Sequence, residues 1–268
     1  MERHFITYQH STIHYSRFGT GEEWLFAFHG YGEQGNTFYV LEEYLGKRYT
    51  IVAIDCPFHG TTDWNEGLLF TPVMLMQIIK KILPPTVEKF TLAGYSMGGR
   101  ISLQLIQDYP DYIKEVVLIA PDGLHHNIWH FLSTQTKIGN LLFFMAMRHP
   151  GFLFFCMRLG NKAGLFNKSV FNFVHYYLDK KESRLILYKR WTTMRKFMPQ
   201  LKKIKLIIKN HHLPLQLVFG KYDRVIVAKN GYHFQQEASE YISVQELEAG
   251  HQLLKEKYAK EISMLFHC

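Results

Sequence analysis

Thr91-Leu92-Ala93-Gly94-Tyr95-Ser96-Met97-Gly98-Gly99-Arg100 is the stretch that decides how the rest of this chain is interpreted. A short apolar run, 90–93, leads straight into the pentapeptide Gly94–Gly98, and a segment with helical spacing, 101–107, follows without a gap. In such a strand-turn-helix the turn is so sharp that the flanking backbones leave no room for a Cβ, which accounts for the two glycines. The pattern predicts that the Ser96 hydroxyl stands clear at the carboxyl edge of a sheet, above a helix N-terminus. A G-x-S-x-G pattern also arises by chance, so the remaining sequence decides its weight.

The length and composition suit a chain with a full hydrophobic core. Its 268 residues, 47% of them hydrophobic, are enough for one large α/β domain or for one domain that carries an insertion. The three cysteines, Cys56, Cys156 and Cys268, show no paired spacing, which argues against a disulfide scaffold or a zinc site. The first residues contain no apolar run of the kind found in a secretion signal, so we expect a cytoplasmic protein.

Eight short runs rich in apolar residues predict strands, and the later ones alternate with segments of helical spacing. The runs are 4–9, 12–17, 24–28, 50–55, 90–93, 115–120, 214–219 and 241–247. The first two predict an opening hairpin, whereas continuous apolar runs are typical of parallel strands that are covered on both faces. The pattern predicts an α/β fold with a doubly wound, mostly parallel eight-stranded sheet. Its ligand site is expected at the carboxyl ends of the strands.

The net charge of +8 is distributed very unevenly along the chain. The segment 124–213 contains sixteen Lys and Arg residues but only two acidic ones, Asp179 and Glu182, while the remainder carries 15 basic and 21 acidic residues. The same segment has apolar and basic stretches of helical length and no convincing strand. We therefore expect 1–123 and 214–268 to form the α/β core domain. We expect 124–213 to form a helical, strongly basic cap that faces an anionic partner or substrate.

Two interpretations of this cap remain open. Its most apolar stretch, 141–155, is interrupted by Arg148-His149-Pro150-Gly151, so neither half is long enough to span a bilayer. The helices either roof a site with their apolar faces or rest on a membrane as a basic amphipathic surface. We favour the roof.

A serine hydroxyl needs a base to take its proton, and the base needs a carboxylate to fix its tautomer. On a doubly wound sheet these groups come in the order serine, acid, histidine, each just beyond a strand end. Ser96, Asp223 and His251 meet this requirement, and the separation of 28 positions from Asp223 to His251 just accommodates one helix and one strand. Asp122 is the rival acid, because it too follows a predicted strand.

Two backbone N–H groups are candidates for the oxyanion hole of such a site. Preorganised N–H donors suit a tetrahedral oxyanion because they do not reorganise during the reaction. One candidate is Met97, at the start of the predicted helix, and the other is Tyr31, which follows His29-Gly30 at a neighbouring strand end.

With these motifs in place, the chain resembles the α/β-hydrolase superfamily. The motifs that fall in family order are His29-Gly30, Asp55-x-Pro57-x-His59-Gly60, Gly94–Gly98, Gly220-x-x-Asp223 and Gly250-His251. The resemblance covers 1–123 and 214–268, and the insertion lies where this family places its cap domain. The family usually has Gly at the position of Phe58 and Ser at that of Thr62, and both departures touch a structural turn.

The resemblance implies acyl-transfer chemistry at the predicted site. Ser96 would attack a carbonyl, His251 would carry the proton, Asp223 would orient His251, and the N–H groups of Tyr31 and Met97 would hold the oxyanion. A serine in place of an aspartate nucleophile argues against epoxide-hydrolase or dehalogenase chemistry. The resemblance implies no cofactor.

We call the turn that carries Ser96, Gly94–Gly98, the elbow. With the following Gly99-Arg100 it is also similar to the elbow of a menaquinone-biosynthesis SHCHC synthase, a lyase that eliminates pyruvate, as well as to that of ordinary esterases. This similarity implies a substrate-binding role for Arg100, and for Tyr95 beside it, with an anionic substrate. The alternative is that Arg100 is a first-turn helix residue bonded to the scaffold.

Other features carry less weight. His125, His126 and His130 are not accompanied by a carboxylate or Cys cluster, so a loop or cap surface is favoured over a metal site. The basic segment is not accompanied by a recognised nucleic-acid-binding module.

The sequence therefore predicts a serine hydrolase that cleaves a carboxylic ester or related acyl bond in a small molecule, with an anionic or lipid-like substrate. A menaquinone-synthase-like lyase is the alternative with the same fold. A non-catalytic or peripheral-membrane protein that uses the basic cap against anionic lipid is the alternative of another class.

Overall fold

The computed structural model describes residues 2–125, 128–151, 155, 178, 180–236 and 238–266. The chain forms two compact units. The first comprises Met1–Glu66, Thr71–His125 and Lys196–Cys268, and the second comprises Gly67–Phe70 and His126–Arg195.

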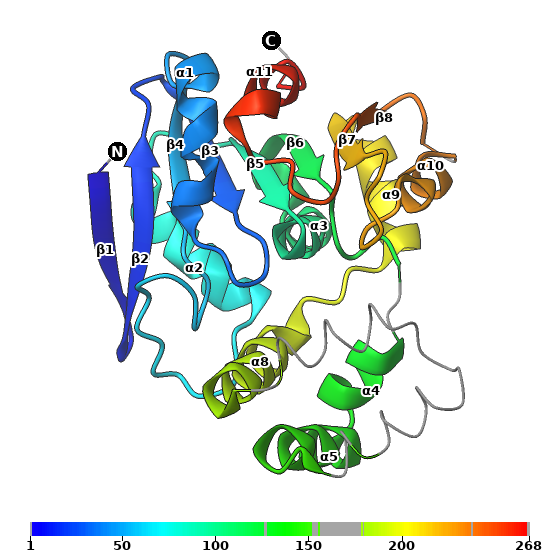
Figure 1. Ribbon diagram of the computed structural model, residues 1–268. Helices are drawn as coiled ribbons and strands as arrows, with labels where there is room; N and C mark the ends of the chain where they lie inside the picture. Colours follow the sequence, from blue (N-terminus) through cyan, green and yellow to red (C-terminus); the bar gives the residue numbers. More distant parts are fainter. Residues whose placement is uncertain are drawn as a thin grey trace. The chain divides into compact units, whose positions relative to one another are not determined.

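The first unit is built on one eight-stranded sheet, in the order β1-β2-β4-β3-β5-β6-β7-β8 (Figure 1). The strands are β1 Glu2–Tyr8, β2 Ser11–Phe18, β3 Glu23–Phe28, β4 Tyr49–Ile54, β5 Phe90–Tyr95, β6 Ile113–Ile119, β7 Leu215–Gly220 and β8 Ile242–Leu247. β1 and β2 form an antiparallel hairpin and β2 is antiparallel to β4, while all later pairs are parallel. The predicted fold class, including the opening hairpin and the eight strands, is confirmed.

Helices cover both faces of this sheet (Figure 1). They are η1 Gly35–Leu41, α1 Glu42–Leu45, α2 Pro72–Ile82, α3 Met97–Asp108, η2 Pro110–Tyr112, α9 Leu201–His211, α10 Ala228–Gln235 and α11 Glu256–Ser263. η1, α1 and α11 contact one another, α3 contacts both α2 and α9, and α10 packs on β7 and β8. The sheet is therefore sandwiched, as continuous apolar strands require.

The central strand β3 shows how the sequence produces this burial. Leu25 and Ala27 belong to the core cluster that includes Ile262 of α11. Because successive side chains alternate across a strand, Phe26 and Phe28 face the other side, where Phe26 makes an edge contact with Phe90 at 5.0 Å between ring centroids. With both faces buried, the carboxyl ends of the strands are left as the accessible edge of the sheet.

Helix α2 shows how local sequence sets the bounds of an element. The Thr71 side chain accepts a hydrogen bond from the Met74 N–H at 3.2 Å, and Pro72 occupies the first turn, where its missing N–H costs nothing. The helix ends at Ile82, before Pro84-Pro85, because the residue before a proline is disfavoured in the helical conformation.

In the second unit, all the elements described are helical. They are α4 Ile128–Gln135, α5 Lys137–Arg148, α8 Lys181–Thr193 and the turn η3 Met194–Lys196, whose last residue belongs to the first unit. Asn140 joins three parts of this unit, because its Nδ2 donates to the Ser133 carbonyl and to Thr192 Oγ1, each at 3.0 Å, and its Oδ1 accepts from the Tyr188 hydroxyl at 3.0 Å.

The sequence placed the end of the insertion at Leu213, whereas the second compact unit ends at Arg195. α9 lies between these two residues and packs against α3 of the first unit. Its buried residues, Ile204 and Ile208, form the apolar face that makes this possible.

The apolar stretch around residue 145 is interrupted as its sequence indicates. α5 ends at Arg148, with Pro150 two residues further on. Across the part of the chain that the structure describes, no helix has the length and apolar character needed to cross a bilayer.

Candidate active site

Ser96 occupies a strained turn between β5, which ends at Tyr95, and α3, which begins at Met97. Its backbone has φ 49° and ψ −112°, a conformation that non-glycine residues adopt only when the surrounding structure enforces it. Three hydrogen bonds hold the Ser96 backbone in this conformation. Ser96 N donates to the Ile119 carbonyl at 2.9 Å, and the Ser96 carbonyl accepts from the N–H groups of Gly99 at 2.9 Å and Asp122 at 2.8 Å.

The two glycines that flank this serine are dictated by close backbone approach. A Cβ on Gly98 would lie 1.8 Å from the carbonyl oxygen of Phe28 on β3, and a Cβ on Gly94 would lie 2.6 Å from the carbonyl oxygen of Gly98. Neither neighbour is a flexible side-chain end, so no side chain fits at either position. The sheet and α3 therefore meet closely enough to hold Ser96 in its strained conformation.

Ser96, His251 and Asp223 are joined by hydrogen bonds at the carboxyl end of the sheet. His251 Nε2 lies 3.1 Å from Ser96 Oγ, and His251 Nδ1 lies 2.7 Å from Asp223 Oδ2. A carboxylate accepts from the Nδ1–H, which leaves Nε2 as the acceptor for the serine hydroxyl. The three residues follow β5, β8 and β7 respectively, so parallel strands bring together positions that are far apart in the sequence.

Asp223 is fixed by hydrogen bonds on both of its carboxylate oxygens. Oδ2 meets His251, while Oδ1 accepts from the backbone N–H groups of Val225 at 2.7 Å and Ile226 at 3.0 Å. Its side chain is fully buried. A carboxylate held in this way keeps one face of the imidazole ring in a single orientation.

The rival acid, Asp122, has other partners. Its Oδ2 pairs with Arg100 Nη2 at 2.7 Å, and its Oδ1 accepts from the Gly123 N–H at 2.7 Å. The structure therefore brings Asp223, and not Asp122, to His251. The same ion pair ties Arg100 to the loop after β6, so an anionic substrate would compete with the Asp122 carboxylate for this guanidinium.

Tyr95 supports the histidine rather than pointing away from the site. Its hydroxyl donates to the His251 carbonyl oxygen at 3.1 Å, and the two rings lie 5.6 Å apart. Burial raises the pKa of Tyr95, and the charges of Glu33 and Asp223 act in the same direction. The phenol thus stays protonated and remains a hydrogen-bond donor at neutral pH.

The two predicted oxyanion donors lie on elements next to the serine. Met97 is the first residue of α3, and the first N–H groups of a helix have no partner within it. Tyr31 follows β3 on a loop that His29 anchors from within. His29 Nδ1–H donates to the Gly30 carbonyl at 2.8 Å, and His29 Nε2 accepts from the Cys56 N–H at 3.1 Å, which fixes its tautomer.

A buried aspartate after β4 holds the neighbouring loops, a role that its sequence context did not indicate. Asp55 Oδ1 accepts from the Gly35 N–H at 2.6 Å, and Oδ2 meets His14 Nδ1 at 2.7 Å and the Thr61 N–H at 3.1 Å. In the same turn Phe58 has φ 62°, a left-handed conformation in which glycine is unstrained. This explains in physical terms why the family usually has glycine there.

Glu33 is a second acidic residue near the site that the sequence analysis did not single out. Its Oε2 is buried without a hydrogen-bond partner, and it would lie 3.3 Å from a Cβ placed on Gly30. Burial raises the pKa of Glu33, while the Gly30 N–H and the charge of His251 act to lower it. The available sequence signal was an acidic residue in the loop His29-Gly30-Tyr31-Gly32-Glu33.

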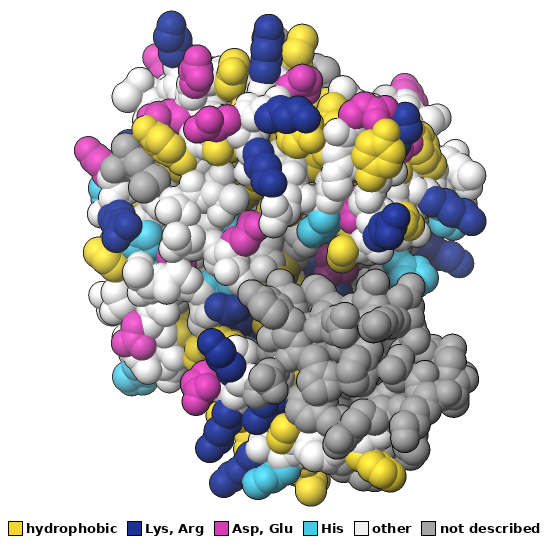
Figure 2. Space-filling view, in the orientation of Figure 1, with side chains coloured by type: hydrophobic (Ala, Val, Ile, Leu, Met, Phe, Trp, Pro, Cys, Tyr) yellow, Lys and Arg dark blue, Asp and Glu magenta, His cyan; other side chains and the backbone are white. Residues whose placement is uncertain are grey.

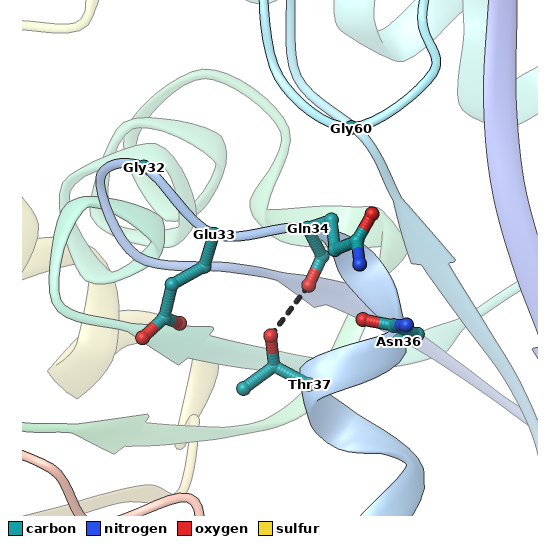
Figure 3. A pocket seen from close by; sticks show the side chains of 6 residues that line it. All are labelled: Gly32, Glu33, Gln34, Asn36, Thr37 and Gly60. Atoms are coloured by element: carbon teal, nitrogen blue, oxygen red, sulfur yellow. Dashed lines mark hydrogen bonds between the residues drawn. The ribbon is translucent and has the colours of Figure 1, made fainter.

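Glu33 also lines a polar pocket of about 300 Å³ on this loop (Figure 3). The other lining residues are Gly32, Gln34, Asn36, Thr37 and Gly60. Figure 3 shows the Glu33 side chain turned away from the Gln34 amide, and the Thr37 hydroxyl donates to the Gln34 carbonyl at 2.7 Å. The pocket is thus formed by the loops after β3 and β4 together with the start of η1, and Ser96 is not among its lining residues.

The histidines considered for a metal site have different surroundings. His125 is exposed, the ring of His130 packs against Trp191 at 5.1 Å, and His126 lies outside the described residues. Within the described ranges, no three His, Cys, Asp or Glu side chains are grouped so that they could hold a metal ion.

Comparison with known proteins points to one family. Residues 23–153 match the family described as alpha/beta hydrolase fold. The chain is 28% identical over 130 residues to a pimeloyl-[acyl-carrier protein] methyl ester esterase of Aeromonas salmonicida, covering 48% of this chain and 50% of that protein. It is 31% identical over 113 residues to the dihydrolipoyllysine-residue acetyltransferase component of an acetoin cleaving system of Cupriavidus necator, covering 41% of this chain and 30% of that protein. The chain thus spans at most about half the length of these curated relatives.

Solved structures of similar fold cover the chain almost completely. A thermophilic esterase from Thermogutta terrifontis superimposes with a TM-score of 0.66 at 16% identity, covering 99% of this chain and 97% of that one. The thioesterase domain of a curacin biosynthetic pathway gives a TM-score of 0.64 at 18% identity, covering 100% and 99% respectively. At these identities the likeness concerns the fold.

Proposed function

We propose that this chain, a member of the α/β-hydrolase superfamily, is a serine hydrolase that cleaves a carboxylic ester or related acyl bond through an acyl-enzyme on Ser96. The observation that carries the proposal is the continuous hydrogen-bonded chain from Ser96 Oγ through His251 to Asp223. A serine in this arrangement has the base that it needs to become a nucleophile.

In the proposed reaction Ser96 Oγ attacks the carbonyl carbon while His251 Nε2 takes the hydroxyl proton. Asp223 stabilises the imidazolium that forms, and it keeps the ring in the tautomer whose Nε2 is the acceptor. The N–H groups of Met97 and Tyr31 bind the oxyanion of the tetrahedral intermediate.

The intermediate then collapses, and His251 gives its proton to the leaving alcohol or thiol. Water enters, His251 takes a proton from it, and the resulting hydroxide attacks the acyl-enzyme carbonyl carbon. When this second intermediate collapses, the proton returns to Ser96 Oγ and the carboxylic acid leaves. Every proton is accounted for by one imidazole, so the proposed reaction needs no cofactor.

The comparisons support an acyl bond as the target. The proteins to which the chain is similar include a methyl ester esterase, an esterase and a thioesterase domain, all of which are named for cleavage of an ester or thioester. For this chain we propose the same bond class, with a small-molecule acyl substrate.

Nothing in the part of the chain that the structure describes favours the lyase alternative. That reaction calls on Arg100 to hold an anionic substrate, and the Arg100 guanidinium already pairs with Asp122. The proposal therefore predicts that Arg100→Ala changes ester hydrolysis far less than a substitution of Ser96.

Hydrolysis of p-nitrophenyl acetate, butyrate and octanoate tests the proposal, with Ser96→Ala as the matched variant. We expect turnover by the wild-type protein and a loss of at least 10³-fold in Ser96→Ala. Acyl thioesters, and the succinyl-enolpyruvyl intermediate of menaquinone synthesis with pyruvate as the readout, extend the assay. If no acyl substrate is turned over, or if Ser96→Ala is as active as the wild type, the proposal fails.

A further inference from the structure

Helix α5 of the second unit is apolar on two sides, and one of these sides is used for packing. Phe143 packs against Tyr188 and Trp191 of α8, with ring centroids 5.5 and 5.7 Å apart, and Phe144 packs against Tyr188 at 5.1 Å. Met147, one turn further on, is buried. These contacts join α5 to α8 and account for the helix's first apolar face.

The second apolar face of α5 is exposed. Ile138 is 75% exposed, Leu141 58%, Leu142 60% and Met145 52%. Leu141, Leu142 and Met145 lie three, four and seven residues after Ile138, so the four side chains are on one side of the helix. A helix that is apolar all round is normally buried all round, so among the described residues this side lacks the partner that its composition calls for.

Helix α4, which packs against α5, repeats the pattern. Ile128, Phe131 and Leu132 are exposed and follow the same three-and-four spacing. We call the seven side chains the apolar stripe, namely Ile128, Phe131, Leu132, Ile138, Leu141, Leu142 and Met145. Seven large apolar side chains on two adjoining helices exceed the scattered exposed residues that need no explanation.

The charges around the stripe favour one kind of partner. Lys137 and Arg148 stand exposed at the two ends of α5. Figure 2 shows Lys and Arg side chains beside hydrophobic ones along its lower edge, where Figure 1 places α5 and α8. The sequence of the second unit has eleven Lys and Arg residues and two acidic ones.

We propose that the apolar stripe is a docking surface for an anionic membrane. The stripe would enter the boundary between headgroups and acyl chains, with α4 and α5 lying in the plane of the interface, while the surrounding Lys and Arg side chains contact anionic headgroups. A second copy of this chain fits less well, because the strongly basic units would repel each other. The docking goes beyond the proposed reaction and does not depend on it.

Vesicle flotation of the full chain tests the proposal. We expect binding to vesicles of phosphatidylcholine with 30% phosphatidylglycerol and weak binding to vesicles of pure phosphatidylcholine. Raising the salt concentration from about 0.1 M to about 1 M shortens the Debye length from about 10 to about 3 Å and weakens the binding. Ile138→Ser with Leu142→Ser lowers affinity at least about tenfold, because two large apolar side chains no longer enter the interface.

A matched double variant outside the second unit controls for general loss of surface hydrophobicity. Val73→Ser with Met264→Ser removes two similarly exposed apolar side chains from the first unit, and it is expected to bind vesicles as the wild type does. Thermal melting checks that both double variants fold. Ser96→Ala is expected to bind unchanged, which separates docking from catalysis.

Three results would overturn the proposal. The first is binding that ignores lipid charge, and the second is equal binding by the stripe variant and the wild type. The third is a stripe variant that hydrolyses soluble p-nitrophenyl octanoate more slowly but binds vesicles normally, which would assign the stripe to substrate. Sedimentation velocity adds a further check, since a dimer that the stripe variant abolishes would assign the surface to self-association.

Discussion

Replacing Asp223 by asparagine keeps the size of the side chain but changes one acceptor into a donor. In the wild type, Asp223 Oδ1 accepts from two backbone N–H groups and Oδ2 accepts from His251 Nδ1. An asparagine oxygen that keeps the two backbone donors turns its NH₂ group towards the imidazole. Two donors then face each other, and the ring must switch to the tautomer that carries its proton on Nε2.

That tautomer cannot accept the Ser96 proton. By analogy with the same substitution in a serine protease triad, the expected loss in kcat is about 10⁴-fold, or about 5 kcal/mol of transition-state stabilisation. Turning the amide over does not rescue the site, because the two backbone donors beside the fully buried side chain would then face an NH₂ group. Unsatisfied buried donors cost about 1–3 kcal/mol each.

Steady-state hydrolysis of p-nitrophenyl butyrate measures this effect, with KM expected to change little because the Asp223 side chain is fully buried. Asp122→Asn is the control, since it removes an ion pair with Arg100 and leaves His251 untouched, and it should cost less than about tenfold. Asp223→Asn with activity within tenfold of the wild type would refute the reasoning. A loss of about 10³-fold or more in Asp122→Asn alone would assign the acid to Asp122.

Three further substitutions test other parts of the site. Gly98→Ala places a Cβ 1.8 Å from the Phe28 carbonyl oxygen, so the elbow must move, and ester hydrolysis should fall at least about 10²-fold. Tyr95→Phe removes a hydrogen bond to the His251 carbonyl worth about 1 kcal/mol, and kcat should fall severalfold. Burial raises the pKa of Glu33, so its charge destabilises the fold once the pH exceeds the range in which unfolded glutamate ionises, about 4.3. Glu33→Gln should therefore raise the melting temperature at pH 7 and leave it unchanged at pH 4.

For each of these substitutions, one result would contradict the expected effect. A fully active Gly98→Ala protein would mean that the close approach to β3 is not needed, and Gly151→Ala, whose Cβ would meet nothing within 4 Å, is its control. A 10⁴-fold loss in Tyr95→Phe would give the phenol a role in the chemistry itself. A melting temperature for Glu33→Gln that lies below the wild type at pH 7 would mean that the ionised carboxylate stabilises the fold.

The strands were predictable because their burial leaves a strong mark on the sequence. β3 and β4 are covered on both faces, which requires a continuous apolar run such as 24–28 or 50–54. The turn at Ser96 was predictable for a related reason, because only glycine fits where its backbone meets β3. Order along the chain and position after a strand then pointed to Asp223 and His251, which the structure brings to Ser96.

Other features depend on packing that no local pattern reveals. The apolar and basic stretches of 124–213 predicted helices, but the sequence does not say that Ile204 and Ile208 of α9 pack with the first unit. Glu33 is one acid among 23 until the loop buries it beside His251. The same limit applies to α5, whose two apolar faces look equivalent in sequence, although one packs on α8 and the other is exposed.

Covalent labelling with a fluorophosphonate tests the central claim most directly, since the reagent traps an activated serine without requiring the natural substrate. Peptide mass spectrometry of the labelled protein should place one phosphonyl group on Ser96. Ser96→Ala should not be labelled, and His251→Ala should be labelled much more slowly because the base is missing. Label on a different residue, or a folded wild-type protein that stays unlabelled, would contradict the assignment of Ser96 as the nucleophile.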